Sequence, residues 1–188
     1  MAASVDSAAP LPTSALPPAV PPAALWLPGS ALGCYESDAV RRDWLLTPGL
    51  LTQRIREAAG PRFAMHVLQE GTASADGTHV REIDMGCGPE VWLFAHTRVP
   101  AATLAAQPWL GSVGTGTLGE ALAAHDATLE REPLCYAMFG ADAWLVSRAL
   151  THAQLPAQNL WVRHSVFRAD GAPFELEEVF LPGMGGEA

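Results

Sequence analysis

Two stretches in which apolar and polar residues alternate predict β-strands that each carry one charge on their apolar face. In residues 79–85 the period of two places Arg81 on the face that is otherwise apolar. In residues 174–181 the same period places Glu178 on the apolar face. A charge on such a face is costly unless it meets an opposite charge or a polar ligand. The two residues therefore predict either a buried Arg81–Glu178 salt bridge or a closed polar pocket inside a sheet protein.

The rest of the pattern predicts an α+β fold with a single antiparallel sheet and flanking helices. Three successive strands are joined by short links around Gly77 and Gly88, which indicate antiparallel hairpins. Asp170-Gly171, between two alternating stretches, is a strong signal for another hairpin. The helices come before and between the strands without βαβ alternation, as in α+β proteins. The expected helices are 39–46, 51–59, 101–107 and 120–125; the expected strands are 63–70, 78–85, 90–98, 160–168 and 174–181; 131–139 favours a strand and 143–150 is ambiguous.

The length and the N-terminal composition predict one folded domain after a disordered extension. A chain of 188 residues is long enough for one domain with a full core. Residues 1–28 are rich in alanine and proline and contain no lysine or arginine, so a disordered extension is expected rather than a signal peptide. Residues 29–188 are expected to form the domain. Since no stretch of about twenty apolar residues is present, no membrane span is expected.

Composition and charge exclude several classes of function. The net charge of −9 argues against nucleic acid as a partner, because no basic patch of the needed size can be assembled. All 11 basic residues are arginine, so chemistry that needs a Schiff-base lysine or a P-loop lysine is excluded. The three cysteines are widely spaced and form no C-x-x-C pair. This usage fits free thiols in a reducing cytoplasm better than disulfides or a zinc site.

Short motifs follow one another in a specific order between Ser37 and Pro182. They are Asp43-Trp44-Leu45-Leu46, Leu51-Thr52-x-Arg54, Arg81-Glu82-Ile83, Val91-Trp92-Leu93-Phe94-Ala95-x-Thr97-x-Val99-Pro100, Leu110-Gly111, Leu118-Gly119, Leu160-Trp161-x-Arg163-x-Ser165-x-Phe167 and Glu178-Val179-Phe180-Leu181-Pro182. Their joint order and spacing resemble the chorismate pyruvate-lyase family. The resemblance implies a monomeric α+β protein with a sheet of about six strands, in which the ligand is sealed in an internal cavity under flaps.

The resemblance also implies an activity and a set of site residues. The family converts chorismate to 4-hydroxybenzoate and pyruvate, the first committed step of ubiquinone biosynthesis, and does so without a metal or other cofactor. Its binding arginine falls on Arg81 and its binding glutamate on Glu178, and both are expected to take part in catalysis. A leucine whose backbone meets the ligand falls on Leu118. A pocket methionine of the family falls on Leu51, a departure that keeps the site apolar.

Other functions and roles stay open at this point. The same fold serves as the ligand-sensing domain of certain bacterial transcription regulators, although no DNA-binding domain is expected in the first 28 residues. A variant pocket that turns the ring would release 3-hydroxybenzoate instead. Arg163 either meets the second carboxylate of the substrate or pairs with a nearby acid. His66 is expected to be a packed or edge histidine rather than a base.

Overall fold

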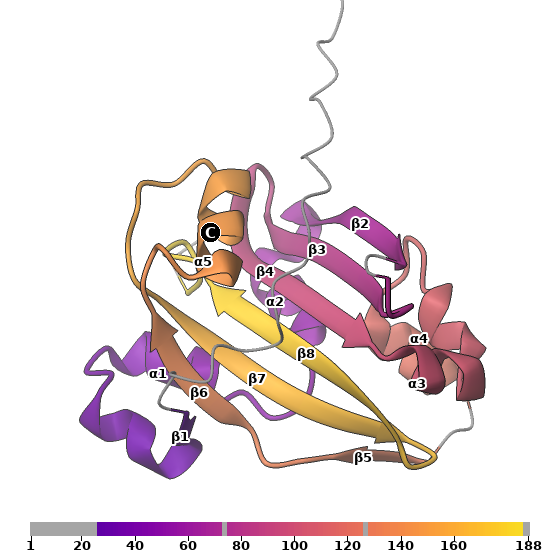
Figure 1. Cartoon of the computed structure of the whole chain (residues 1–188). Helices are drawn as coiled ribbons and strands as arrows, with labels where there is room; N and C mark the ends of the chain where they lie inside the picture. Colours follow the sequence, from indigo (N-terminus) through magenta and orange to yellow (C-terminus); the bar gives the residue numbers. More distant parts are fainter. Residues whose placement is uncertain (1–25, 73–74, 126–127, 186–188) are drawn as a thin grey trace, which may run out of the picture.

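The protein, described here by a computed structural model over residues 26–72, 75–125 and 128–185, forms one antiparallel sheet with helices on both faces (Figure 1). The sheet has eight strands rather than about six, because two short strands add to the six longer ones. The strands are β1 (Leu27–Pro28), β2 (Phe63–Thr72), β3 (His79–Cys87), β4 (Glu90–Val99), β5 (Leu129–Arg131), β6 (Cys135–Phe139), β7 (Leu160–Ala169) and β8 (Ala172–Phe180). The helices are α1 (Ala39–Leu45), α2 (Leu51–Ala59), α3 (Ala101–Ala106), α4 (Leu118–Ala124) and α5 (Trp144–His152).

The order of the strands confirms the predicted α+β fold with a single antiparallel sheet. Neighbouring strands run in the order β1-β6-β7-β8-β4-β3-β2, and β5 pairs with the end of β7. The expected extension, residues 1–28, lies outside the described residues except at 26–28, where Leu27 and Pro28 pair with β6. None of the helices in the described part of the chain is long and apolar enough to cross a bilayer.

Local sequence signals explain where several elements begin and end. The Asp38 side chain accepts hydrogen bonds from the first backbone amides of α1, as expected for a helix N-cap. Asp170 and Gly171 have φ angles of 48° and 82°, and a two-residue hairpin turn between β7 and β8 requires such left-handed residues. The ambiguous stretch 143–150 comprises the N-cap and most of α5, whose buried side chains repeat with the helical period.

The alternation of side chains along the strands divides the core into two layers. One layer packs α1 and α2 against the face that carries Ile83, Leu176 and Phe180. The other layer packs α5 against Phe94 and Val179. Figure 1 shows α5 in front of the sheet and α1 and α2 behind it. Arg81 lies two residues from Ile83 on β3, and Glu178 lies two residues from Leu176 and Phe180 on β8. Both side chains therefore point to the same face as these core residues, away from α5 and toward α1 and α2.

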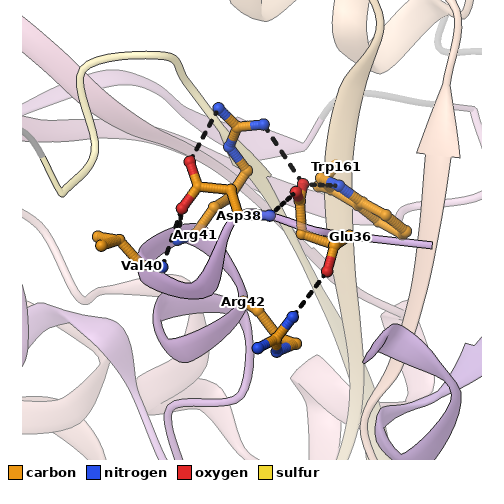
Figure 2. A network of polar contacts seen from close by, with 6 residues as sticks. All are labelled: Glu36, Asp38, Val40, Arg41, Arg42 and Trp161. Atoms are coloured by element: carbon orange, nitrogen blue, oxygen red, sulfur yellow. Dashed lines mark hydrogen bonds and ion pairs between the residues drawn. The ribbon is translucent and has the colours of Figure 1, made fainter. Parts of the chain in front are cut away.

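A buried glutamate ties α1 to the sheet (Figure 2). The Glu36 carboxylate accepts a hydrogen bond from Trp161 Nε1 on β7 at 2.7 Å and from the Asp38 backbone amide at 2.8 Å. Arg41 donates to the same carboxylate, and Arg42 donates to the Glu36 carbonyl. These contacts fix the start of α1 beside β7, and the loop that follows α1 accepts hydrogen bonds from β7.

Candidate active site

Arg81 lies on β3 inside the protein, with 3% of its surface exposed. Its Nη2 donates to the backbone carbonyls of Gly114 and Gly116, at 3.0 and 2.7 Å. Its Nε is buried and has no hydrogen-bond partner among the described residues. Burial lowers the pKa of Arg81 from its ordinary value, and the nearby Glu70 opposes this shift. The glycine-rich loop therefore holds the guanidinium through Nη2. A ligand carboxylate could accept hydrogen bonds from its remaining N–H groups.

Glu70 on β2 is a charged neighbour that the sequence did not identify. Its Oε1 lies 3.7 Å from Arg81 Nε and accepts a hydrogen bond from the Gly114 amide at 3.3 Å. Strict alternation from Val67 would place Glu70 on the opposite face, but the pairing of β2 with β3 shifts by one residue between Val67 and Gln69. This β-bulge turns Glu70 to the side of Arg81. A bulge of this kind has no marker in the sequence of β2.

Glu178 lies on β8, is 2% exposed, and pairs with Arg163 rather than with Arg81. Arg163 stands directly opposite on β7, is fully buried, and donates from Nε to Glu178 Oε2 at 2.6 Å. It also donates to the carbonyls of Thr47 and Gly49, at 2.8 and 3.2 Å. The Arg81–Glu178 salt bridge considered from the sequence is therefore not formed. Of the two roles considered for Arg163, the pairing with a nearby acid is the one observed.

Leu51 and Leu118 cover this part of the sheet from two helix starts. Each is the first residue of its helix, α2 and α4, and both belong to the buried core layer that contains Ile83 and Leu176. The two helix starts meet, since the Leu50 side chain lies 3.1 Å from the position that a Cβ on Gly119 would take. Of the residues expected in the site, the structure places Arg81, Glu178, Leu51 and Leu118 on one side of the sheet. Their roles toward a substrate stay predictions.

His79 adds a buried titratable group beside Arg81. It is 5% exposed, and its Nε2 has no hydrogen-bond partner among the described residues. Burial, followed by the charge of Arg81, lowers the pKa of His79 below its ordinary 6.5, although Glu70 acts in the opposite direction. The site therefore keeps this imidazole neutral near neutral pH.

The lowered pKa of His79 predicts a specific loss of stability in acid. Below about pH 6.5 the unfolded chain binds a proton at this histidine more readily than the folded protein does. The free energy of unfolding therefore decreases as the pH is lowered. We expect the His79→Leu variant to lose less stability than the parent between about pH 8 and about pH 5. Urea unfolding at both pH values measures this difference, and equal losses in parent and variant would contradict the assignment.

His66 lies away from the site, on the side of the sheet that α5 covers. Its Nδ1 is 2.8 Å from Asp84 Oδ1, and His152 of α5 contacts the other oxygen of the same carboxylate. The neighbouring Glu82 binds Arg148 of α5 and, at 3.1 Å, His96. Of these contacts, those of Arg148 and His152 attach α5 to the sheet. The expectation that His66 is not a base at the site agrees with this location.

The sequence is similar to proteins of a known family. A family model described as "Chorismate lyase" matches residues 20–184. The chain belongs to the chorismate lyase family. A protein from Thiobacillus denitrificans named "Probable chorismate pyruvate-lyase" is 32% identical over 173 residues, which cover 85% of this chain and 89% of that protein. A protein of the same name from Azoarcus sp. is 35% identical over 164 residues, covering 77% of this chain and 85% of that protein.

A comparison of structures adds information on the fold alone. The crystal structure of "possible transcriptional regulator YydK" from Bacillus subtilis aligns with a TM-score of 0.50 at 8% identity, covering 64% of this chain and 58% of that one. The fold of this chain is thus also similar to part of a protein that is named as a possible transcriptional regulator. Since one fold can host more than one function, the fold alone does not assign an activity.

Proposed function

We propose that this protein is a chorismate pyruvate-lyase, which splits chorismate into 4-hydroxybenzoate and pyruvate. The observation that carries the proposal is the pair of opposite charges, Arg81 and Glu178, buried on one side of the sheet without being paired to each other. Arg81 keeps a buried Nε that has no hydrogen-bond partner among the described residues, and Arg163 holds Glu178 through one carboxylate oxygen, Oε2. The family membership and the relatives' names support the same activity.

The charges fit the two ends of the aromatic product. Chorismate carries one carboxylate on its ring and one hydroxyl across the ring from it. Arg81 presents a planar guanidinium, which binds a carboxylate through paired hydrogen bonds in a site that excludes water. Arg163 orients the Glu178 carboxylate, which can accept a hydrogen bond from the hydroxyl. Leu51 would supply apolar contact to the ring, and the backbone at Leu118 would meet the ligand.

We propose that catalysis works by positioning. Loss of pyruvate makes the ring aromatic, so the reaction is strongly favourable and needs no powerful acid. In the direct route, the hydrogen on the carbon that bears the hydroxyl moves to the enolpyruvyl methylene while the ether C–O bond breaks. In the alternative route, Glu178 removes that hydrogen as a general base. We favour the direct route because holding the side chain of the substrate in a reactive geometry can supply several powers of ten in rate.

The proposal extends to the biological setting that the family resemblance implies. The reaction would be the first committed step of ubiquinone biosynthesis, carried out in the cytoplasm by a monomer without a metal or cofactor. The catalytic domain would span residues 29–188. Support for these finer points comes from the resemblance described above.

Incubation of the purified protein with chorismate in heavy water tests the proposal. We expect 4-hydroxybenzoate and pyruvate in equal amounts by chromatography, and no deuterium in the methyl group of freshly released pyruvate. Deuterium there would contradict direct transfer but not the lyase activity. Release of 3-hydroxybenzoate would contradict the assigned product. Chorismate that is bound but unchanged would overturn the proposal in favour of a ligand-sensing module.

A further inference from the structure

A cavity of about 700 Å³ lies where the starts of α2 and α4 approach the strands β5 and β7. Its wall includes Gly49 and Leu50 before α2, Gly119 of α4, and the side chains of Arg131 and Phe167. Leu50 and Gly119 touch each other, so the segments that line this cavity are continuous with Leu51 and Leu118, which cover the site. The cavity is therefore the neighbour of the buried site.

Arg131 is held firmly at the edge of this cavity. Its Nη1 donates to the Gly49 carbonyl at 2.9 Å, and its Nη2 donates to Ser165 Oγ at 2.7 Å. The guanidinium carbon lies 4.9 Å from the centre of the Phe167 ring, within the range of a cation–π contact. The Nε atom is buried and has no hydrogen-bond partner among the described residues. These contacts use two of the five N–H groups of a pre-oriented guanidinium and leave the buried Nε–H unsatisfied.

The charges around Arg131 do not balance. Among the described residues no ion pair joins Arg131 to a carboxylate, and the buried Glu178 is already bound by Arg163. Burial lowers the pKa of Arg131, the adjacent charge of Arg163 lowers it further, and Glu178 offsets only part of this. Arg56, the other cation that lines the cavity, is half-exposed and has its own partner in Glu120 at 3.3 Å. A half-buried cation without a counter-ion bears part of the cost of burying a charge, and an anionic ligand would reduce that cost.

We infer that Arg131 binds the second carboxylate of the substrate, the one that leaves with pyruvate. This inference rests on the proposed function. In chorismate the enolpyruvyl ether is attached to the ring carbon next to the one that bears the hydroxyl. With the hydroxyl at Glu178, the enolpyruvyl carboxylate lies at the end of the ring far from Arg81, where Arg131 and Arg163 both donate to Gly49. Arg163 is occupied by Glu178, so Arg131 is the cation with capacity for this carboxylate.

The inference predicts that Arg131 distinguishes substrate from product. 4-Hydroxybenzoate lacks the enolpyruvyl carboxylate, so Arg131→Gln is expected to raise KM for chorismate by about 10- to 100-fold while the Kd of 4-hydroxybenzoate stays within about twofold. The Arg131→Lys variant keeps the charge and is expected to recover part of the loss. The matched control is Arg168→Gln, which removes an exposed arginine of β7 that pairs with Glu132. It should change neither constant.

The outcomes separate this inference from the proposed function. Equal weakening of chorismate and 4-hydroxybenzoate by Arg131→Gln would show a structural role and overturn the inference, as would no change in either. If the parent protein bound chorismate without converting it, the lyase proposal would fail, and the same comparison made on equilibrium Kd values from tryptophan fluorescence would still test Arg131. A parent protein that binds neither compound would overturn both.

Discussion

The Arg81→Gln variant is expected to lose chorismate turnover, with kcat/KM lower by at least about two powers of ten. The reason is the loss of a charge-assisted contact in a buried site, which typically contributes about 2–3 kcal/mol. Arg81→Lys should recover little, because an ammonium cannot replace a planar guanidinium that also donates to Gly114 and Gly116. Steady-state kinetics with chorismate, combined with circular dichroism to verify folding, measure the effect.

A control on the neighbouring strand makes the Arg81 result specific. Arg98 lies on β4, is half-buried and pairs with Glu175 at 3.4 Å, on the other side of the sheet from Arg81. Like Arg81→Gln, Arg98→Gln removes one positive charge, and it does so on the adjacent strand. It should leave kcat/KM within about twofold, as expected for a partly exposed ion pair. If Arg81→Gln turned over chorismate at the parent rate, Arg81 would not be the carboxylate-binding group.

The second large effect is on stability and concerns the Arg163–Glu178 pair. Glu178→Leu leaves Arg163 fully buried without its carboxylate, and breaking a buried ion pair in this way typically costs about 3–5 kcal/mol. The double variant Glu178→Leu/Arg163→Met removes both charges and is expected to be more stable than Glu178→Leu alone. Urea unfolding of the parent, both single variants and the double variant gives the coupling energy.

Two results would contradict the prediction for this pair. A loss below about 1 kcal/mol for Glu178→Leu would mean that Arg163 is solvated or finds another acid. A double variant less stable than Glu178→Leu would mean that the hydrogen bonds from Arg163 to Thr47 and Gly49 outweigh the ion pair. All variants that lack Glu178 should lack turnover, because the proposed acceptor for the substrate hydroxyl is gone.

Much of the fold follows from local patterns in the sequence. Alternation places Arg81 and Glu178 on apolar faces, and the structure puts both on the same side of one sheet. The turn at Asp170-Gly171 and the cap at Asp38 follow from the backbone preferences of those residue types. These features depend on a few neighbouring residues, so a single sequence contains the information that they need.

The contacts that complete the site depend on register, which alternation alone does not provide. Glu70 reaches Arg81 only through the bulge in β2, and Arg163 meets Glu178 because β7 and β8 pair directly. Arg131 lies in a stretch that the sequence favoured as one strand, but residues 131–139 contribute to two strands, β5 and β6, on the same edge of β7. Its guanidinium is brought to the site by this edge and by Gly49, which is distant in the sequence.

A crystal structure of the protein with 4-hydroxybenzoate bound tests most directly whether Arg81 and Glu178 hold the two ends of the ligand. We expect the carboxylate of the ligand within hydrogen-bond distance of the Arg81 guanidinium and its hydroxyl at Glu178, with Leu51 and Leu118 against the ring. A ligand found elsewhere, with Arg81 and Glu178 both out of contact with it, would show that these two residues do not form the binding site.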